Sequence, residues 1–425
     1  MNNIGNITNR YSFVHFINGI IMGLIAPIMY VVLRDKGFEI FEIGFLIIIS
    51  SITTVLSEIP CGMLSDRIGR KKMYIGGQLT FILFCLGMIY IDTMDIMILA
   101  MVAAGFSTAM TSGTLDALFV DTLNKHNIIP ETLQKSLAKV GGISMLGLFV
   151  GAILSGVFAS FNLPGKNTSS FENNYVIAAS LIPLLLILAN RLIEETYEAK
   201  GINATQSVSF ISQIDSAFVN LKQSQSLLLM MLSSSLGAIA MISFEKFWQL
   251  ELRELTQNED MKWMFGTLFS VSLIIAGFGQ ALSAKLCQCF NNNYVHSLIF
   301  IRILQGSLFI ILFMDHSLFS FSIVFMLIFF VSALSQSPVM TLFHHEVKDS
   351  ERSTMLSMRS VFLQLGAVIG IIMASFSTHF VSLKFAFIIS ATVYFMSISV
   401  LLSKQLLGLG DKLSQLNDKP QLETK

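Results

Sequence analysis

A short charged loop between two apolar runs carries the residue types best suited to chemistry in this chain. It reads GMLSDRIGRKK at positions 62–72. Its charged residues are Asp66, Arg67, Arg70, Lys71 and Lys72. A carboxylate and guanidinium groups at this spacing can form charge-assisted hydrogen bonds with one another and with neighbouring helix ends. Gly62 and Gly69 permit a tight turn between two helices. The loop therefore indicates a charged junction where two helices meet.

Four further charges fall within apolar runs, at positions expected in the same third of their helices. They are Glu58, Asp116, Lys139 and Arg359. A charge inside a bilayer costs at least about 2.5–3.5 kcal/mol on insertion scales, so each needs a partner or a task. Two acids and two bases at one depth predict an ion-pair network across an inner gate. A proton-carrying role for Glu58 or Asp116 is the alternative, and both roles can coexist.

Glu245 differs from these four because it lies about 20 residues into its apolar run, in the opposite third. Phe244, Phe247 and Trp248 are expected to surround it, while Lys246 points about 100° away around a helix. Glu245 is a candidate proton- or cation-recognition site, or alternatively a snorkelling or outer-gate residue. Arg302 is expected near the inner interface, with its head group reaching water.

The composition requires a membrane environment for most of the chain. Of its 425 residues, 53% are hydrophobic and only 13% charged, and the mean hydropathy is +0.70. Soluble domains carry roughly 25% charged residues. The net charge of zero gives no indication of a nucleic-acid partner. The spacing of Cys287 and Cys289 is not a zinc motif, and we predict no metal site and no cofactor.

Twelve apolar runs have the length of a membrane-spanning helix, for which about 20 residues are needed. The predicted spans cover residues 11–33, 40–64, 73–91, 95–121, 134–160, 174–192, 225–250, 264–286, 296–314, 317–343, 354–378 and 383–403. They divide into a bundle of six at 1–192 and a second bundle at 225–403. A polar linker at 193–224 is predicted to contain an amphipathic helix, or alternatively to be disordered, and residues 404–425 form an unstructured polar tail.

The charges of the loops predict the orientation. Lys and Arg gather in the even-numbered loops, whereas the odd-numbered loops are neutral or acidic, so both termini are expected in the cytoplasm. The even-numbered loops hold Arg67, Arg70, Lys71, Lys72, Lys125, Lys135, Lys285, Lys348 and Arg352.

The two halves repeat one another. The segment LGLFVG at 146–151 matches LGAVIG at 365–370, an offset of 219 residues, and 63–67 matches 281–285 at an offset of 218. Two nearly equal offsets predict duplicated six-helix halves, an architecture in which substrate binds near the midplane between the repeats. Ala284 replaces Asp66 in the second copy, so the inner gate is expected to be asymmetric.

Uncharged polar residues on several spans are candidates for lining a largely apolar substrate cavity, or alternatively for joining helices to one another. They are, with one methionine, Asn18, Met22, Thr108, Thr111, Ser233, Ser234, Ser335, Gln336 and Gln364. Trp248 belongs with them as the aromatic neighbour of Glu245. Such a chamber suits amphipathic organic molecules better than sugar phosphates.

The charged loop resembles the loop 2–3 signature of the major facilitator superfamily, with Gly62, Asp66, Arg67, Gly69 and Arg70 in register. Glu58-Ile59-Pro60 and the segment 112–123 look similar to bacterial drug-efflux and general-permease branches. The resemblance implies an all-α membrane fold of two pseudo-symmetric six-helix bundles. It also implies that Asp66 faces the start of helix 11 and that Arg70 pairs with an acid on helix 4, here Asp121, so that both contacts close the inner gate. Helix 5 lacks the Gly-Pro pair of drug–proton antiporters.

These features predict a secondary transporter rather than an enzyme, because no Walker, HExxH or GxSxG sequence is present. We expect a monomer in the bacterial inner membrane, in contact with lipid, that exports an amphipathic small molecule such as a drug, secreted metabolite or siderophore in exchange for protons. Uptake of a metabolite is the alternative within this class, and a transporter-like sensor or assembly factor is the alternative outside it.

Overall fold

A computed structural model describes residues 2–126, 128–161, 171–195, 224–256, 261–314, 317–347 and 352–418. The predicted amphipathic linker helix lies almost wholly outside these residues. All regular structure in the described part is helical. The first half contains α1 (Asn2–Ile25), α2 (Met29–Asp35), α3 (Ile40–Ile68), α4 (Arg70–Tyr90), α5 (Met94–Thr111), α6 (Thr114–Asn124), α7 (Pro130–Ala159) and α8 (Glu172–Leu192). The second contains α10 (Gln225–Thr256), α11 (Trp263–Cys289), α12 (Tyr294–Met314), α13 (Leu318–Leu334), α14 (Gln336–Glu346), α15 (Arg352–Phe380), α16 (Leu383–Leu401) and α17 (Lys404–Asp418).

Twelve segments of the described chain are long and apolar enough to cross a membrane, which confirms the predicted number of spans. Three of the twelve consist of two helices each, namely α1 with α2, α5 with α6, and α13 with α14. Gly113 separates α5 from α6 and has a φ of +63°, a left-handed conformation that glycine adopts without steric cost. Ser335 separates α13 from α14. The fourth span of each half is therefore broken.

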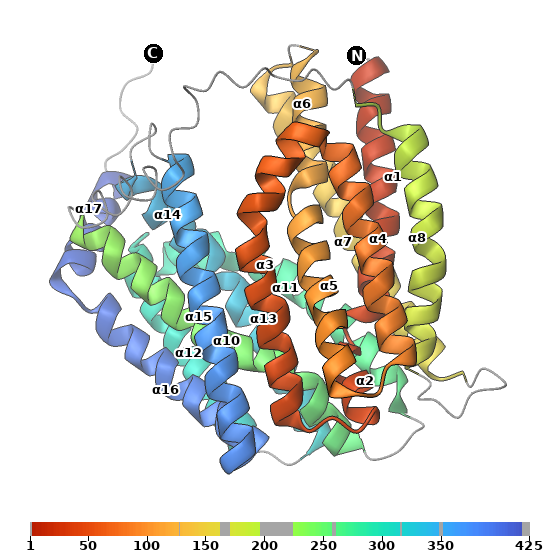
Figure 1. The fold of residues 1–425 in the computed structure, drawn as a ribbon. Helices are drawn as coiled ribbons and strands as arrows, with labels where there is room; N and C mark the ends of the chain where they lie inside the picture. Colours follow the sequence, from red (N-terminus) through yellow and green to blue (C-terminus); the bar gives the residue numbers. More distant parts are fainter. Residues whose placement is uncertain are drawn as a thin grey trace. The chain divides into compact units, whose positions relative to one another are not determined.

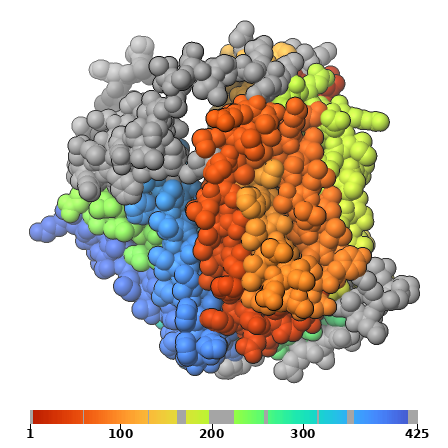
Figure 2. Space-filling view, viewed as in Figure 1, coloured from red at the N-terminus to blue at the C-terminus, as the bar shows by residue number. Residues whose placement is uncertain are grey.

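The described residues form two compact units (Figure 1). The first unit comprises Met1–Lys200 together with Leu252–Ser270, and the second comprises Gly201–Glu251 together with Val271–Lys425. In the first unit α3, α4 and α5 lie side by side, and Figure 2 shows them on one face. Many of their exposed side chains are apolar, including Leu56, Leu83 and Leu99. An apolar surface of this kind is what a bilayer solvates.

In each unit a glycine lets two helices come into close contact. A Cβ atom on Gly147 of α7 would collide with the carbonyl oxygen of Phe16 on α1, and one on Gly366 of α15 would meet the carbonyl oxygen of Ser235 on α10. Because Gly366 and Ser235 each follow their counterparts by 219 residues, the two units repeat the same helix contact. Small residues at such crossings let membrane helices pack closely.

Residues 252–270, at the end of α10 and the start of α11, belong to the first unit. Arg253 Nη2 lies 3.3 Å from Asp35 Oδ1 of α2. The rings of Phe265 and Phe171 are 5.4 Å apart between centroids, and Lys262 Nζ is 5.8 Å from the Phe171 ring centroid. An ion pair and aromatic contacts therefore join this segment of the second repeat to α2 and to the start of α8.

The prediction of an unstructured tail is wrong for residues 404–418, which form α17. Leu406, Leu409 and Leu413 of this helix are buried in the interior of the second unit. Asp411 accepts a hydrogen bond of 3.0 Å from the Asn293 side chain at the start of α12. The polar composition of the segment concealed this stripe, whose spacing is that of one helical face.

Candidate functional site

The charged junction is a helix–helix turn of one residue. Gly69 alone separates α3 from α4 and has a φ of +104°, which disfavours any other residue. Gly62 does not take part in this turn, contrary to the sequence-based prediction, because α3 continues to Ile68. The helix therefore continues past residue 64, where the apolar run and the predicted span end.

Hydrogen bonds connect the turn to the end of α8, through a side chain from each of the two segments. The carboxylate of Glu195 accepts hydrogen bonds from the backbone N–H groups of Arg70 (2.6 Å) and Lys71 (3.2 Å), the first residues of α4. Lys71 Nζ donates to the carbonyl oxygens of Asn190 and Ile193 at 2.8 Å, where α8 ends. An anion at one helix N-terminus and a cation at another C-terminus both complement the helix dipoles. The sequence analysis did not identify Glu195, which follows the last residue of a span.

The Arg70 side chain lies between two acids. Its Nη1 is 2.9 Å from Asp121 Oδ2 of α6, and its Nη2 is 3.8 Å from Asp66 Oδ1 one turn earlier on α3. The pairing of Arg70 with Asp121, implied by the resemblance, is therefore present. The orientation of Asp66 toward helix 11 stays a prediction. Arg67 lies in the last turn of α3, where the helix dipole favours a positive charge.

Two members of the predicted ion-pair network contact other residues within the first unit, and the network across the inner gate stays a prediction. Lys139 donates to the side chain of Asn9 at 2.8 Å, and Asp116 Oδ1 lies 3.6 Å from His15 Nε2. Both partners are on α1, because α1 packs against α6 as well as α7 and so separates the acid from the base. Glu58 is exposed on α3.

The polar residues of the first unit act mostly within and between helices. Asn18 accepts a hydrogen bond of 3.0 Å from Gln78, which is 1% exposed. This bond joins α1 to α4, which is the alternative role given for Asn18, while its cavity-lining role stays a prediction. Thr108 and Thr111 donate to carbonyl oxygens of their own helix at 2.9 and 2.8 Å. Met22 is partly buried.

A hollow of about 280 Å³ opens between α10 and α15 in the second unit. Its lining residues are Ala238, Ile242, Glu245, Ser360, Leu363, Gln364 and Ala367. The Gln364 amide donates to the Ser360 hydroxyl at 3.4 Å. The hollow thus combines alkyl walls with one carboxylate, one amide and one hydroxyl, and its volume is close to the lower end of the range of small-molecule sites.

The aromatic residues next to Glu245 in the sequence do not surround it. The Phe244 ring centroid lies 5.4 Å from that of Phe325, and the Trp248 ring 4.8 Å from the same residue. Trp248 is 1% exposed and lines neither of the two cavities of the second unit, and its place in a substrate cavity between the repeats stays a prediction. Successive residues of a helix point about 100° apart, which turns these rings into the interior and Glu245 toward α15.

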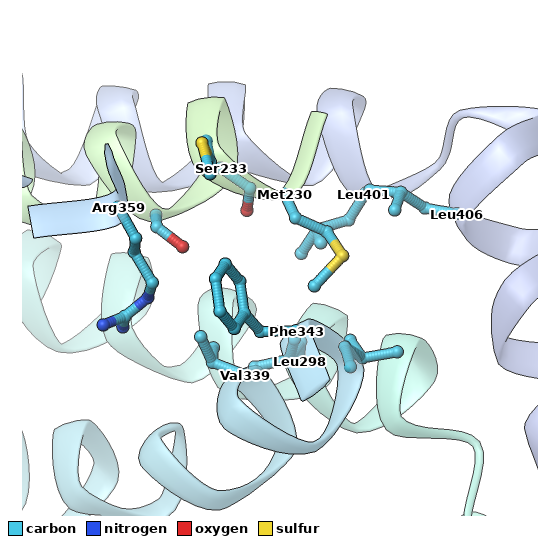
Figure 3. Close-up of a pocket in the computed structure, with 11 residues that line it drawn as sticks. Met230, Ser233, Leu298, Val339, Phe343, Arg359, Leu401 and Leu406 are labelled. Atoms are coloured by element: carbon cyan, nitrogen blue, oxygen red, sulfur yellow. The ribbon is translucent and has the colours of Figure 1, made fainter. Parts of the chain in front are cut away.

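A second cavity in the same unit contains Ser233, Ser234 and Arg359 (Figure 3). Ser335 and Gln336 line neither cavity. They form the junction of α13 and α14, where the Ser335 hydroxyl donates to the Ser332 carbonyl oxygen at 2.7 Å.

Arg302 is buried rather than at the interface. Its side chain is inside the second unit, with Nη1 donating to Gln305 Oε1 at 3.0 Å. The guanidinium carbon lies 5.3 Å from the Tyr394 ring centroid, and Gln305 continues the contact to Ser332 at 3.2 Å. The predicted snorkelling position is therefore wrong. Counting along an apolar run gives the depth of a residue but not the direction of its side chain.

Charges also gather at the end of the first unit opposite Gly69. Lys36 Nζ lies 2.7 Å from Asp92 Oδ1 and 3.0 Å from Glu172 Oε1, next to the Asp35–Arg253 pair. The side chains of Lys36 and Glu172 are 4% and 5% exposed. The sequence analysis missed this cluster because its members stand at the ends of spans, where charges are ordinary. No group of three or more metal-ligating side chains occurs among the residues that the structure describes.

Comparisons with known proteins agree with this architecture. The family model described as Major Facilitator Superfamily matches residues 11–343. Multidrug resistance protein 1 of Bacillus subtilis is 22% identical over 82% of this chain and 84% of its own length. The uncharacterized MFS-type transporter YxaM of B. subtilis is 27% identical, but the match covers 36% of this chain and 37% of that protein.

Among solved structures, the nucleoside transporter NupG superposes with a TM-score of 0.71 at 16% identity, covering 94% of this chain and all of that one. This likeness shows the shared fold. Together with the twelve membrane-spanning segments and the repeated halves, the match to the family model over most of the chain shows that this multi-pass membrane protein is a transporter of the major facilitator superfamily.

Proposed function

We propose that this transporter exports an amphipathic organic small molecule across the bacterial inner membrane in exchange for protons. The observation that carries the proposal is the hollow at Glu245, where a carboxylate on a membrane-spanning helix faces alkyl walls and the amide of Gln364. Ionisable groups within membrane spans mark ion and proton pathways. An amphipathic substrate would place its apolar part against Ile242 and Leu363, while Glu245 exchanges protons.

Alternating access requires contacts that break and re-form at both ends. Ion pairs at opposite ends of the first unit support such gating: Arg70 with Asp121 near Gly69, and Asp35 with Arg253 at the other end. We infer that the Gly69 end faces the cytoplasm, because the basic loops are found there. Asp66, Arg67 and Glu58 belong to this proposed inner gate, as does Asp116 beside His15.

The direction of transport rests on similarity. Multidrug resistance protein 1, matched over most of both chains, supports export of amphipathic molecules. We further propose that the protein acts as a monomer in contact with lipid.

Reconstituted protein tests the coupling directly. Flux of an amphipathic dye such as ethidium would be measured in proteoliposomes with and without an imposed pH gradient, beside exchange at equal pH. The wild type should respond to the gradient, whereas Glu245→Gln should lose that response and retain exchange. Glu254→Gln is the matched control, because Glu254 is an exposed acid near the end of the same helix.

Three results would decide against the proposal. Full gradient-driven flux in Glu245→Gln would remove Glu245 from the coupling step. Accumulation of substrate only in the direction of the proton flow would instead indicate uptake. The absence of both flux and exchange for a broad panel of amphipathic compounds would favour the sensor or assembly role.

A further inference from the structure

Helix α6 is separated from α5 by Gly113 and is held in the first unit by side-chain contacts with α4 and α1. A Cβ atom on Gly113 would meet nothing within 4 Å, so this glycine serves the left-handed turn and not close packing. Toward α4, Asp121 pairs with Arg70 at 2.9 Å, a contact of the proposed inner gate. The position of α6 therefore determines whether Asp121 reaches Arg70.

The contacts of α6 with α1 include an imidazole, and Figure 1 shows α6 at the end of the first unit where α1 begins. The Tyr11 ring centroid lies 4.8 Å from that of Phe119, and the Tyr11 hydroxyl lies 3.2 Å from the hydroxyl of Thr122. One turn further along α1, His15 Nε2 lies 3.6 Å from Oδ1 of Asp116, in the first turn of α6. Residues four apart share a helix face, so one face of α1 makes all three contacts.

The surroundings of His15 make the charge of its ring important for the contact with α6. The His15 side chain is 12% exposed and that of Asp116 is 63% exposed, so the carboxylate connects a mostly buried ring to water. The buried Nε2 has no hydrogen-bond partner among the described residues. Imidazole is the side chain whose unperturbed charge change, at about pH 6.5, falls in the physiological range. Proton uptake would turn the contact with Asp116 into a charge-assisted pair.

Asp116 is the acid within ion-pair distance of His15 in the part of the chain that the structure describes. The other ionisable groups of α6, and those at this end of the helices that pack on α1, contact different residues or are exposed. They are Asp121 with Arg70, Lys139 with Asn9, Lys135 with Glu131, Arg10 with Glu194, Tyr11 with Thr122, and the exposed Lys125, His126 and Arg191. A proton on His15 therefore acts chiefly on the first turn of α6.

We propose that His15 is a second proton-binding site, which acts through Asp116 on the position of α6 and so on the inner gate. Protonated His15 holds the first turn of α6 against α1 and keeps Asp121 in place for Arg70. Loss of the proton releases that turn, and the Gly113 turn lets α6 tilt. The control of the gate rests on the proposed function, whereas proton binding and the response of α6 do not. An exporter that admits protons acidifies the cytoplasm, and a gate that stays closed at low cytoplasmic pH limits that acidification.

The mobility of a spin label on α6 tests the proton site without any substrate. The label would be attached at Asn124, an exposed residue at the end of α6, in the full chain in lipid nanodiscs with its native cysteines replaced. It should be more mobile at pH 8 than at pH 6 when His15 is present, and equally mobile at both pH values in His15→Gln. His126→Gln is the matched control, because it removes an exposed imidazole two residues from the label, and it should keep the pH response.

A pH response that persists in a folded His15→Gln protein would overturn the proton site. So would a protein with His15 present that shows no response, or a response that His126→Gln abolishes to the same extent. If His15→Gln does not fold, Asp116→Asn provides the test, because it changes an exposed side chain and removes the charge that faces the ring. A retained response in that variant would also overturn the site.

Exchange of ethidium at equal pH on both sides of the membrane tests the control of the gate. The Glu245→Gln background removes the other proposed proton site, and in it exchange should be about two- to fivefold faster at pH 8 than at pH 6, the size of effect that one partly exposed ion pair supplies. Adding His15→Gln should remove this difference. Exchange that does not depend on pH, beside an intact response of the label, would reject the control of the gate. Absence of all exchange would count against the transport proposal, and the label alone would then decide the proton site.

Discussion

Gly151 of α7 packs directly on the backbone of Ile20 of α1, so closely that a Cβ atom on the glycine would overlap the isoleucine carbonyl oxygen. The same contact recurs 219 residues later, between Gly370 of α15 and Ile239 of α10. The repeat detected in the sequence is thus a repeat of a helix crossing. In each unit the crossing joins the first span to the fifth.

This crossing predicts a position-specific effect of a single methyl group. Gly151→Ala should destabilise the protein by about 1–3 kcal/mol, because the helix backbones must separate. Gly142→Ala, in the same helix with open space around it, should be neutral or slightly stabilising. Thermal unfolding of the purified variants measures the difference, and equal melting temperatures would show that the close packing is not important.

Because the Glu195 carboxylate caps the start of α4, we expect it to contribute more to the unfolding free energy than the adjacent Glu194. Glu195→Gln should lower the unfolding free energy by about 1–2 kcal/mol, because it weakens charge-assisted bonds to two backbone N–H groups. Glu194→Gln should cost less than about 1 kcal/mol, because its ion pair with Arg10 is exposed. Chemical unfolding of the two variants provides the comparison. Equal effects would argue against the capping role.

The Arg70–Asp121 pair predicts a defect in transport rather than in folding. Asp121→Asn removes the partner at 2.9 Å and should slow exchange several-fold by weakening the proposed inner gate. The charge-exchanged variant, Arg70→Asp with Asp121→Arg, should recover part of the lost rate. Glu131→Gln, which breaks the exposed pair with Lys135, is the control and should exchange at the wild-type rate. A normal rate in Asp121→Asn would contradict the gating role.

The sequence was sufficient for the features that depend on local pattern. Apolar length predicts the spans, the equal offsets predict the repeat, and the resemblance supplies the pairing of Arg70 with Asp121. The hydrogen-bond and ion-pair partners of the charged side chains could not be predicted in the same way. It depends on how each helix is rotated against its neighbours, which decides that Lys139 bonds to Asn9 and that Asp116 lies beside His15.

Features at span ends escaped the sequence analysis for a different reason. Glu195 and Lys36 stand where charges are expected at a membrane surface, so neither their type nor their spacing distinguishes them. Their contacts come from segments far apart in the chain, such as the start of α4 with the residues after α8. The Trp248 ring packs on Phe325 and does not line the hollow at Glu245, because near neighbours in sequence point to different sides of a helix.

Alternating access is the central claim, and paired distance measurements test it most directly. Spin labels would be placed at exposed positions that the loop charges assign to the same membrane face, Lys72 with Gln288 for the proposed cytoplasmic face and Tyr90 with Val381 for the other face, in a protein with its native cysteines replaced. A change of pH or the addition of substrate should lengthen one distance and shorten the other. Two distances that stay constant, or that change in the same direction, would contradict the account.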